Sequence, residues 1–204
     1  EIETPDRKIL WTGDFDTRDS PTTQGAQPVQ ADVLFMEATY GDSDHPERAA
    51  EEQRFIDRVV EVVERGGTAL VPVFANGRSQ DVLMLLWKSK LNLNVHFDGM
   101  GQRVTKTFLA HPEFVNDVKG LKEAFHWSKR VSSKSDRKKA LSADVIVTTS
   151  GMLDGGPSLW YLNRLRNDQR NAILLTGYQA EGSGGRLLTE TGRQIGRASC
   201  RERV

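Results

Sequence analysis

Short apolar runs alternate along this chain with longer amphipathic stretches. Residues 33–36 carry no polar side chain, which predicts a strand covered on both faces of a sheet. Residues 68–74 predict a second buried strand, and residues 145–149 are the most β-branched run of the chain. Further strands are expected at residues 8–12, 93–97 and 172–176.

Helical periodicity separates these strands. A helix expected over residues 46–65 carries one apolar stripe, formed by Phe55, Val59, Val62 and Val63. Other helices are expected at residues 80–88, 102–110, 121–125, 135–142 and 159–166. Strands alternating with helices at this spacing predict an α/β fold with a parallel sheet and crossover helices.

Two acidic residues directly follow predicted strands. Asp14 comes after the strand at residues 8–12, with Gly13 allowing the backbone to turn, and Glu37 comes directly after residues 33–36. The chemistry of open α/β sheets sits where strands end, so both carboxylates are candidate site residues. The same spacing also fits two acids that only cap turns or helices, and it leaves both interpretations open.

Three glycine-bearing loops follow predicted strands, at residues 76–79, 150–158 and 177–185. Such loops leave backbone N–H groups uncovered, and a helix N-terminus adds positive potential, which suits a phosphate. None of them matches the nucleotide-binding P-loop or a G-x-G-x-x-G turn after a strand. Grouped at one sheet edge, they favour an extended, phosphate-rich ligand. The alternative is that the glycines only mark turns.

Composition indicates a soluble globular chain, with 37% hydrophobic and 27% charged residues and no apolar run near the ~20 residues of a membrane span. A start at Glu1 without a signal peptide predicts a chain that begins inside a longer gene, and a cytoplasmic location. One cysteine, Cys200, excludes a disulfide framework and a cysteine-rich zinc site. None of the scattered histidines is expected to bind metal; they are His45, His96, His111 and His126.

Charge is balanced overall, at 28 basic and 28 acidic residues, but it is unevenly distributed. Residues 42–64 hold eight acidic and three basic side chains, whereas residues 119–139 hold eight basic and two acidic ones. A basic surface attracts phosphates even on a neutral protein. Because no aromatic residues interleave the basic run at residues 129–139, which includes Arg137, the interpretation that it only solvates a helix is favoured.

Five longer motifs resemble those of one family. They are TGDF at 12–15, EATYG at 37–41, VPVFANGRSQ at 71–80, TTSGMLDGGPS at 148–158 and LTGYQAEGSGGRLL at 175–188. In this order they resemble the β-CASP branch of the metallo-β-lactamase-fold ribonucleases, which includes RNase J and the mRNA 3′-end-processing endonuclease. The residues of these motifs are most similar to those of archaeal members. The resemblance covers the chain to about residue 194.

The resemblance implies a particular division of the α/β fold. Residues 1–41 would be a partial strip of a metallo-β-lactamase-like αββα domain, and residues 42–194 a parallel-sheet β-CASP insert domain. Residues 195–204 depart from the family and are expected to be a non-native tail. The implied function is zinc-dependent hydrolysis of RNA phosphodiester bonds in RNA processing or decay. The resemblance also implies two zinc ions per full-length subunit, RNA as the partner and no membrane association. A homodimer is among the oligomeric states that it allows.

The resemblance also implies roles for single residues. Asp14 would bridge the two metals, and Glu37 would orient a downstream histidine that donates a proton to the leaving oxygen. The RNA groove would involve Gly77, Arg78, Ser150, Gly151, Met152, Tyr178, Glu181 and Gly182.

Most ligands of a two-zinc site are missing from this sequence. The family's H-x-H-x-D-H cluster and its later histidine motifs are both absent. We therefore expect a piece of a longer ribonuclease that is itself catalytically silent. Two alternatives stay open: a non-catalytic RNA-binding paralogue of the same fold, and a metallo-β-lactamase-type hydrolase of small esters.

Overall fold

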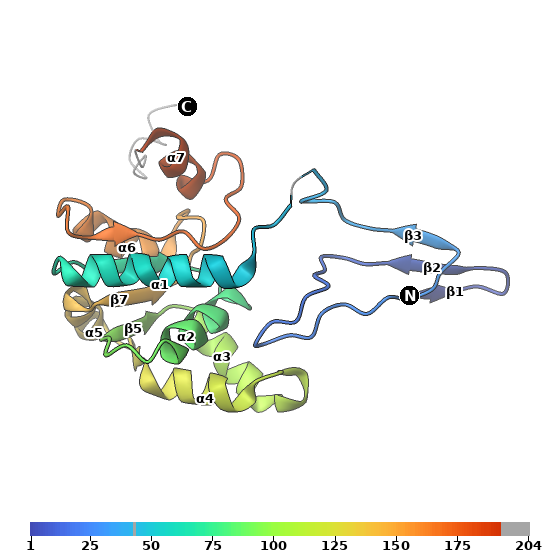
Figure 1. Cartoon of the computed structure of the whole chain (residues 1–204), viewed down its shortest axis with the longest axis horizontal. Coiled ribbons are helices and arrows are strands. Elements are labelled where there is room, and N and C mark those ends of the chain that lie inside the picture. The colour runs from blue at the N-terminus through green and yellow to red at the C-terminus, as the bar shows by residue number, and fades with distance from the viewer. Residues whose placement is uncertain (43, 193–204) are drawn as a thin grey trace.

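A computed structural model describes residues 1–42 and 44–192 (Figure 1). The first residues form a small sheet of β1 (Ile2–Glu3), β2 (Lys8–Trp11) and β3 (Val33–Phe35). The described residues from α1 onward form an α/β body, which lies beside this sheet. Its elements, in chain order, are α1 (Arg48–Glu64), β4 (Ala69–Pro72), α2 (Arg78–Lys88), β5 (Val95–Asp98), α3 (Gly101–Ala110), η1 (Pro112–Phe114), α4 (Val118–Trp127), β6 (Lys129–Arg130), α5 (Lys134–Lys139), η2 (Ala140–Ser142), β7 (Val145–Thr148), α6 (Gly156–Leu165), β8 (Ala172–Ile173) and α7 (Gly184–Thr191).

The strands of the body form one five-stranded sheet in the order β6-β5-β7-β4-β8, and every pair is parallel. The alternation of strands and helices therefore predicted the sheet correctly. Because all strands run in the same direction, the loops that follow β4, β7 and β8 leave from the same edge. The three glycine-bearing loops are accordingly grouped at one edge of the sheet.

Alternate residues of the central strands pack into two cores on opposite faces of this sheet. Val71 of β4 and Val147 of β7 belong to one core, with apolar side chains from α1, α2 and α4. Their sequence neighbours Leu70 and Ile146 belong to the other core, with side chains from α6. The connections that follow the adjacent strands β4 and β7 thus leave toward opposite faces. Such a switch point opens a crevice at the carboxyl ends of the strands, where ligands of open α/β sheets bind.

The N-terminal sheet differs from its prediction in burial. Leu34, Phe35 and Met36 are exposed, although their apolar run predicted a strand covered on both faces. β3 pairs only with β2, and the ring of Phe35 stacks on exposed Trp11 at 5.5 Å between centroids. The run forms the expected strand, but no described element packs over it.

A polar turn joins the N-terminal sheet to the body. The connection between β2 and β3 reaches across, so that Thr22 is buried and donates a hydrogen bond to Asp81 of α2 at 3.1 Å. The backbone N–H of Asp117 donates to Pro21 O at 2.9 Å, and the side chain of Asn116 donates to Ser20 O at 2.8 Å. These contacts fix the N-terminal residues against α2 and the start of α4.

A buried ion pair lies at the end of β5. Asp98, which is 2% exposed, accepts two hydrogen bonds from Arg137, at 2.6 and 3.0 Å, and one from the Tyr161 hydroxyl at 2.9 Å. Burial and the neighbouring Asp98 carboxylate raise the pKa of Tyr161, so its hydroxyl stays protonated as a donor. The interpretation that the basic run only solvates a helix is therefore wrong for Arg137, which joins α5 to β5 and α6.

Four short elements were not expected from the sequence: β1, η1, β6 and α7. The helix predicted at residues 121–125 is longer, because Asp117 caps its first turn by accepting from the backbone of Gly120. No helix within the described residues is long and apolar enough to cross a membrane. The expected tail at residues 195–204, with Cys200, lies outside the described residues.

Replacing Arg137 by methionine tests the buried pair. Arg137→Met leaves the carboxylate of Asp98 buried with Tyr161 as its remaining side-chain donor, and we expect a loss of roughly 3 kcal/mol in the free energy of unfolding. Lys138→Met, on an exposed neighbouring side chain, is the matched control and should change this free energy by less than about 0.5 kcal/mol. Urea unfolding followed by circular dichroism measures both. Equal midpoints for the two variants would contradict the structural role of Arg137.

Candidate nucleic-acid interface

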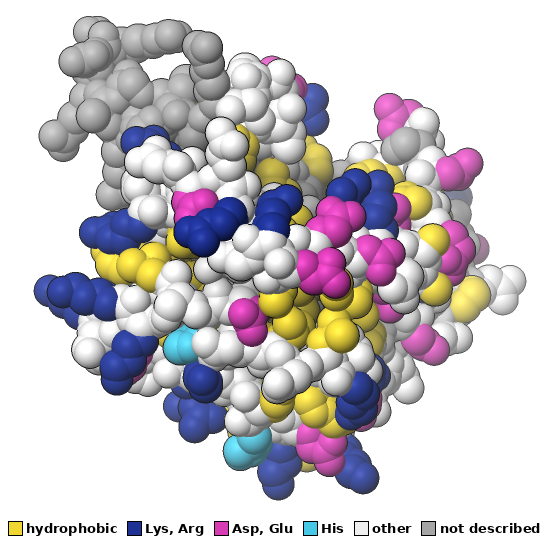
Figure 2. Space-filling model, turned by 60° about the vertical axis from the view of Figure 1, so that its left-hand side comes forward, with side chains coloured by type: hydrophobic (Ala, Val, Ile, Leu, Met, Phe, Trp, Pro, Cys, Tyr) yellow, Lys and Arg dark blue, Asp and Glu magenta, His cyan; other side chains and the backbone are white. Residues whose placement is uncertain are grey.

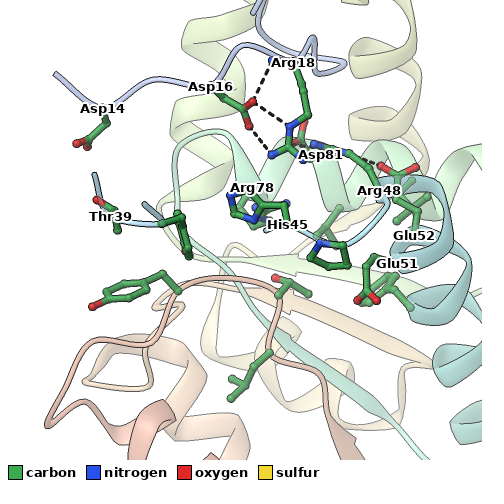
Figure 3. Close-up of a pocket in the computed structure, with 18 of the residues that line it drawn as sticks. Asp14, Asp16, Arg18, Thr39, His45, Arg48, Glu51, Glu52, Arg78 and Asp81 are labelled. Atoms are coloured by element: carbon green, nitrogen blue, oxygen red, sulfur yellow. Dashed lines mark hydrogen bonds and ion pairs between the residues drawn. The ribbon is translucent and has the colours of Figure 1, made fainter. Parts of the chain in front are cut away.

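A cleft of about 1090 Å³ lies between the N-terminal residues and the carboxyl edge of the parallel sheet. Its walls come from five segments: residues 14–18, residues 36–41, the start of α1, the start of α2, and the end of β8 with the loop after it. Figure 3 shows Asp14, Thr39, His45 and Arg78 around this cleft. Four of the predicted site residues line it, namely Asp14, Glu37, Arg78 and Tyr178.

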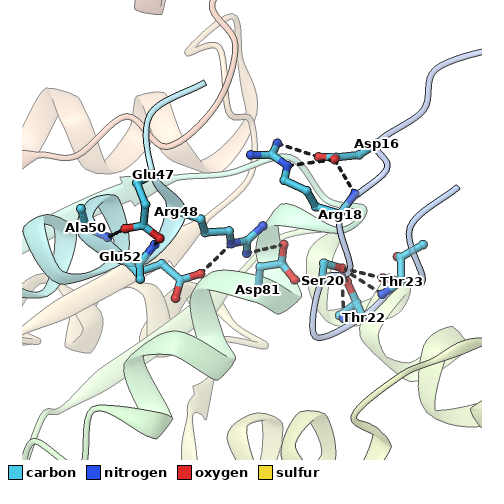
Figure 4. Close-up of polar contacts among 11 residues, drawn as sticks. Asp16, Arg18, Ser20, Thr22, Thr23, Glu47, Arg48, Ala50, Glu52 and Asp81 are labelled. Carbon is cyan, nitrogen blue, oxygen red and sulfur yellow. Dashed lines mark hydrogen bonds and ion pairs between the residues drawn. The ribbon is translucent and has the colours of Figure 1, made fainter. Parts of the chain in front are cut away.

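The acidic residues of the cleft differ in their partners. Asp16 accepts two hydrogen bonds from the guanidinium of Arg18, at 3.0 and 2.8 Å, and Arg18 lowers the pKa of Asp16 to about 2 (Figure 4). Asp14 makes no hydrogen bond or ion pair with a described residue. Glu37 accepts a hydrogen bond from the Thr39 N–H at 2.8 Å, and the side chain and backbone of Thr39 lower the pKa of Glu37. The carboxylate at the TGDF position is therefore the one left open to an external ligand.

The basic residues of the cleft are mostly neutralised. Arg48 lies 2.7 Å from Glu52 and 3.5 Å from Asp81, and these acids raise its pKa against the opposing effect of burial. Arg18 is paired with Asp16, and the other paired arginines of the cleft are Arg54, with Glu51, and Arg58, with Glu61. Among the described arginines that line the cleft, Arg78 alone makes no side-chain hydrogen bond or ion pair.

Arg78 is placed by the loop after β4. Gly77 has a φ of 71°, a left-handed conformation that a glycine adopts without strain, and it lets the chain turn directly into α2. The hydroxyl of Ser79 donates to Phe74 O at 2.6 Å and secures the turn. Arg78 therefore occupies the first position of α2, where the N-terminal end of the helix adds to its positive potential.

The predicted residues after β7 lie beside this turn and do not line the cleft. Gly151 is buried, and a Cβ there would come within 3.0 Å of the Phe74 backbone nitrogen. The N–H of Ser150 donates to Ser158 Oγ at 3.2 Å, and Met152 O accepts from the Gly185 N–H at 2.8 Å. Part of the N–H cradle predicted from the sequence is thus satisfied within the protein.

The loop after β8 carries the last predicted site residues. Tyr178 lines the cleft and is exposed, whereas Glu181 and Gly182 are exposed outside its lining. Gln179 donates from its side chain to Gly151 O at 3.1 Å, which joins this loop to the loop after β7. Glu181 and Gly182 therefore lie on a loop that is fixed to the same edge of the sheet.

Sequence reasoning missed several residues that line the cleft. Tyr40 and His45 form a ring contact at 4.5 Å between centroids, and Tyr40 meets Tyr178 edge-to-face at 6.5 Å. Tyr40 lies inside the EATYG motif, so that motif was a usable signal. The only sequence signal at Arg48 was its i,i+4 spacing to Glu52, and the only signal at Asp81 was its place in the first turn of a helix. Both features are common in helices.

The donor set of the described residues does not fit a two-zinc site. Such a site needs several histidines around a bridging carboxylate. Within residues 1–42 and 44–192 no group of three or more His, Cys, Asp or Glu side chains converges for a metal ion. Asp14 is one oxygen donor, and His45 is the one histidine that lines the described part of the cleft.

Charge is segregated on the molecular surface. On the face in Figure 2, Lys and Arg side chains predominate toward the left and lower edges, and most Asp and Glu side chains lie toward the right. This agrees with the contrast between residues 42–64 and 119–139. Such a surface directs a polyanion toward one side of the protein.

Comparisons with known proteins identify relatives. The Beta-Casp domain family matches residues 80–188. The probable RNase MJ4 of Methanocaldococcus jannaschii is 41% identical over 196 residues, which cover 92% of this chain and 46% of the relative. RNase aCSPSF2 of Saccharolobus solfataricus is 40% identical over 189 residues, with coverages of 91% and 38%. The transcription termination factor FttA of Methanocaldococcus jannaschii is 36% identical over 209 residues, with coverages of 92% and 32%.

The chain thus spans less than half the length of each of these three relatives. The Beta-Casp match covers more than half of the chain and extends from α2 to α7. The five-stranded parallel sheet agrees with that match, as do the archaeal relatives with the resemblance found in the sequence. This chain belongs to the β-CASP ribonuclease family.

Proposed function

We propose that this chain forms the RNA-binding wall of a metal-dependent ribonuclease, together with a strip that carries two of its carboxylates. The observation that carries the proposal is the unpaired guanidinium of Arg78, which lines the same cleft as Asp14 and Glu37. Two of the relatives are named RNases, which supports RNA as the ligand. We further propose residues 1–41 as part of a metallo-β-lactamase-like domain and residues 42–194 as the β-CASP domain, in an intracellular protein.

Arg78 is the proposed phosphate ligand. A guanidinium without an internal partner loses no protein contact when it binds a phosphate, whereas Arg18 and Arg48 would first have to leave their carboxylates. The cleft, at about 1090 Å³, has room for an extended strand of nucleic acid, whereas a small ester would fill little of it. RNA hydrolysis is therefore favoured over hydrolysis of small esters.

Asp14 and Glu37 are the proposed chemical residues. Asp14 is an uncommitted carboxylate, as a metal ligand requires, and Glu37 is ionised and oriented by Thr39. The relatives are more than twice as long as the stretch matched here, which leaves room in the whole protein for the histidines that a two-zinc site needs. Zinc, when bound, would supply Lewis-acid activation of water.

The first test replaces Arg78. Arg78→Ala in the 204-residue chain should weaken binding of a single-stranded RNA by about tenfold and reduce the slope of log affinity against log salt by about 0.7, the loss of one phosphate contact. Fluorescence anisotropy over a series of salt concentrations measures both quantities. Arg166→Ala, an exposed arginine outside the cleft lining, removes the same charge and should leave the slope unchanged. Identical slopes for both variants would remove Arg78 from the RNA contact.

The second test concerns zinc. We expect the metal-stripped 204-residue chain to take up no stoichiometric, tightly bound zinc and to leave RNA intact, because too few donors converge. Elemental analysis after desalting and gel electrophoresis of the RNA measure the two outcomes. Two retained zinc ions with chelator-sensitive cleavage would contradict this expectation. RNA binding without cleavage in the whole protein would instead identify a non-catalytic paralogue.

The third test separates the two carboxylates in the whole protein. Asp14→Asn should lower both zinc content and the cleavage rate, because an amide supplies no charge to a metal ion. Glu37→Gln should retain the zinc and lower mainly the rate, by about 10- to 100-fold, because it disturbs only the surroundings of the ligands. Equal zinc loss in both variants would contradict these roles.

A further inference from the structure

Two tyrosines from distant segments meet in the cleft. Tyr40 follows β3 and Tyr178 follows β8, and their rings lie 6.5 Å apart between centroids at an interplanar angle of 89°. His45 contacts Tyr40 at 4.5 Å, so three rings form one corner of the cleft wall. An edge-to-face pair of this kind leaves a ring face free for a further aromatic group.

Neither tyrosine has the features of a structural residue. Tyr161 shows what those features are in this protein, since it is 0% exposed and its hydroxyl donates to Asp98. Tyr40 is 45% exposed and Tyr178 is 54% exposed. Among the described residues, neither hydroxyl has a hydrogen-bond partner. Two large rings kept at the surface of a cleft without a polar contact contribute little to folding and are available to a ligand.

We propose that Tyr40 and Tyr178 form a stacking subsite for one nucleobase of the bound RNA. The base stacks on the free face of one ring and meets the edge of the other, while Arg78 on the same cleft binds a neighbouring phosphate. This inference rests on the proposed function and names a part of the RNA that the cleft recognises. Since every base has a π-face, the subsite tolerates all four bases and favours single-stranded RNA, whose bases are free to stack.

Two RNA ligands, one with bases and one without, distinguish base contacts from phosphate contacts. A hexa-adenylate offers both kinds of contact, whereas a hexamer of abasic ribose phosphates offers only the phosphates. We expect the 204-residue chain to bind hexa-adenylate about 5- to 100-fold more tightly than the abasic hexamer, from the usual contribution of one stacked base. Fluorescence anisotropy with each labelled hexamer gives the two affinities.

Substitution of the rings locates this preference. Tyr178→Leu and Tyr40→Leu should each reduce the preference for hexa-adenylate toward unity and leave affinity for the abasic hexamer unchanged. Tyr178→Phe keeps the ring and should keep the preference. Phe114→Leu, on an exposed aromatic residue outside the cleft lining, is the matched control and should change neither affinity. Thermal unfolding of each variant should match that of the parent chain, because the rings are exposed.

The outcomes distinguish the two proposals. Binding of both hexamers with equal affinity, or a preference that survives both leucine substitutions, overturns the subsite and leaves the RNA-binding cleft standing. Binding of neither hexamer overturns the RNA-binding cleft and the subsite with it. A preference lost in the leucine variants and retained in Tyr178→Phe supports the stacking subsite.

Discussion

The carboxylate of Asp81 joins three separate parts of the molecule. It accepts a hydrogen bond from the Thr22 hydroxyl at 3.1 Å, and its other oxygen lies 3.5 Å from Arg48 (Figure 4). Thr22 belongs to the connection between β2 and β3, Arg48 begins α1, and Asp81 lies one turn after Arg78 on α2. The Asp81 side chain is only 13% exposed, so its contacts are less screened than those of a surface pair. The contacts of Asp81 therefore fix the position of Asp14 and Glu37 relative to Arg78, although none of these three side chains takes part in them.

The same sequence pattern has two different outcomes in this chain. Residues 33–36 and β7 are both apolar runs, yet β7 is fully buried and residues 34–36 are exposed. The difference comes from the surrounding chain. Successive strands of the body are joined through helices that return across the sheet, and these helices cover it on both faces. The N-terminal strands are joined by a polar connection that reaches the body instead. Periodicity predicts the strand, but burial of the strand depends on which other elements pack against it. The pattern within the strand carries no information about those elements.

The fold was predictable where local patterns repeat, and the site was not. Helix stripes and β-branched runs placed four of the five strands of the parallel sheet and most helices, because both depend on nearby residues. Arg137 was indistinguishable from its basic neighbours, since its partner Asp98 is distant in sequence. The turn at residues 20–23 is polar and carries no apolar signal, although Thr22 is buried. Tyr40 and Tyr178 meet only after the body has folded. The family-like motifs singled out Asp14, Glu37 and Arg78, and the structure brings these three residues to one cleft.

The charges of the cleft limit what it can bind by itself. A polyanion that reaches Arg78 also approaches Asp14 and Glu37, and like charges in a shared cleft repel. The ion pair with Arg18 neutralises Asp16, so Asp16 adds little to this repulsion. Glu52 and Asp81 neutralise Arg48 in the same way, so Arg48 attracts the polyanion little. One open guanidinium then shares the cleft with two carboxylates, which repel a phosphate at the N-terminal wall and leave Arg78 and base stacking as the main contacts for RNA. A metal ion held by Asp14 would offset this repulsion with its positive charge. In the proposed enzyme, the main phosphate contact of this chain would accordingly lie on the wall of the α/β body, at Arg78, and not beside Asp14.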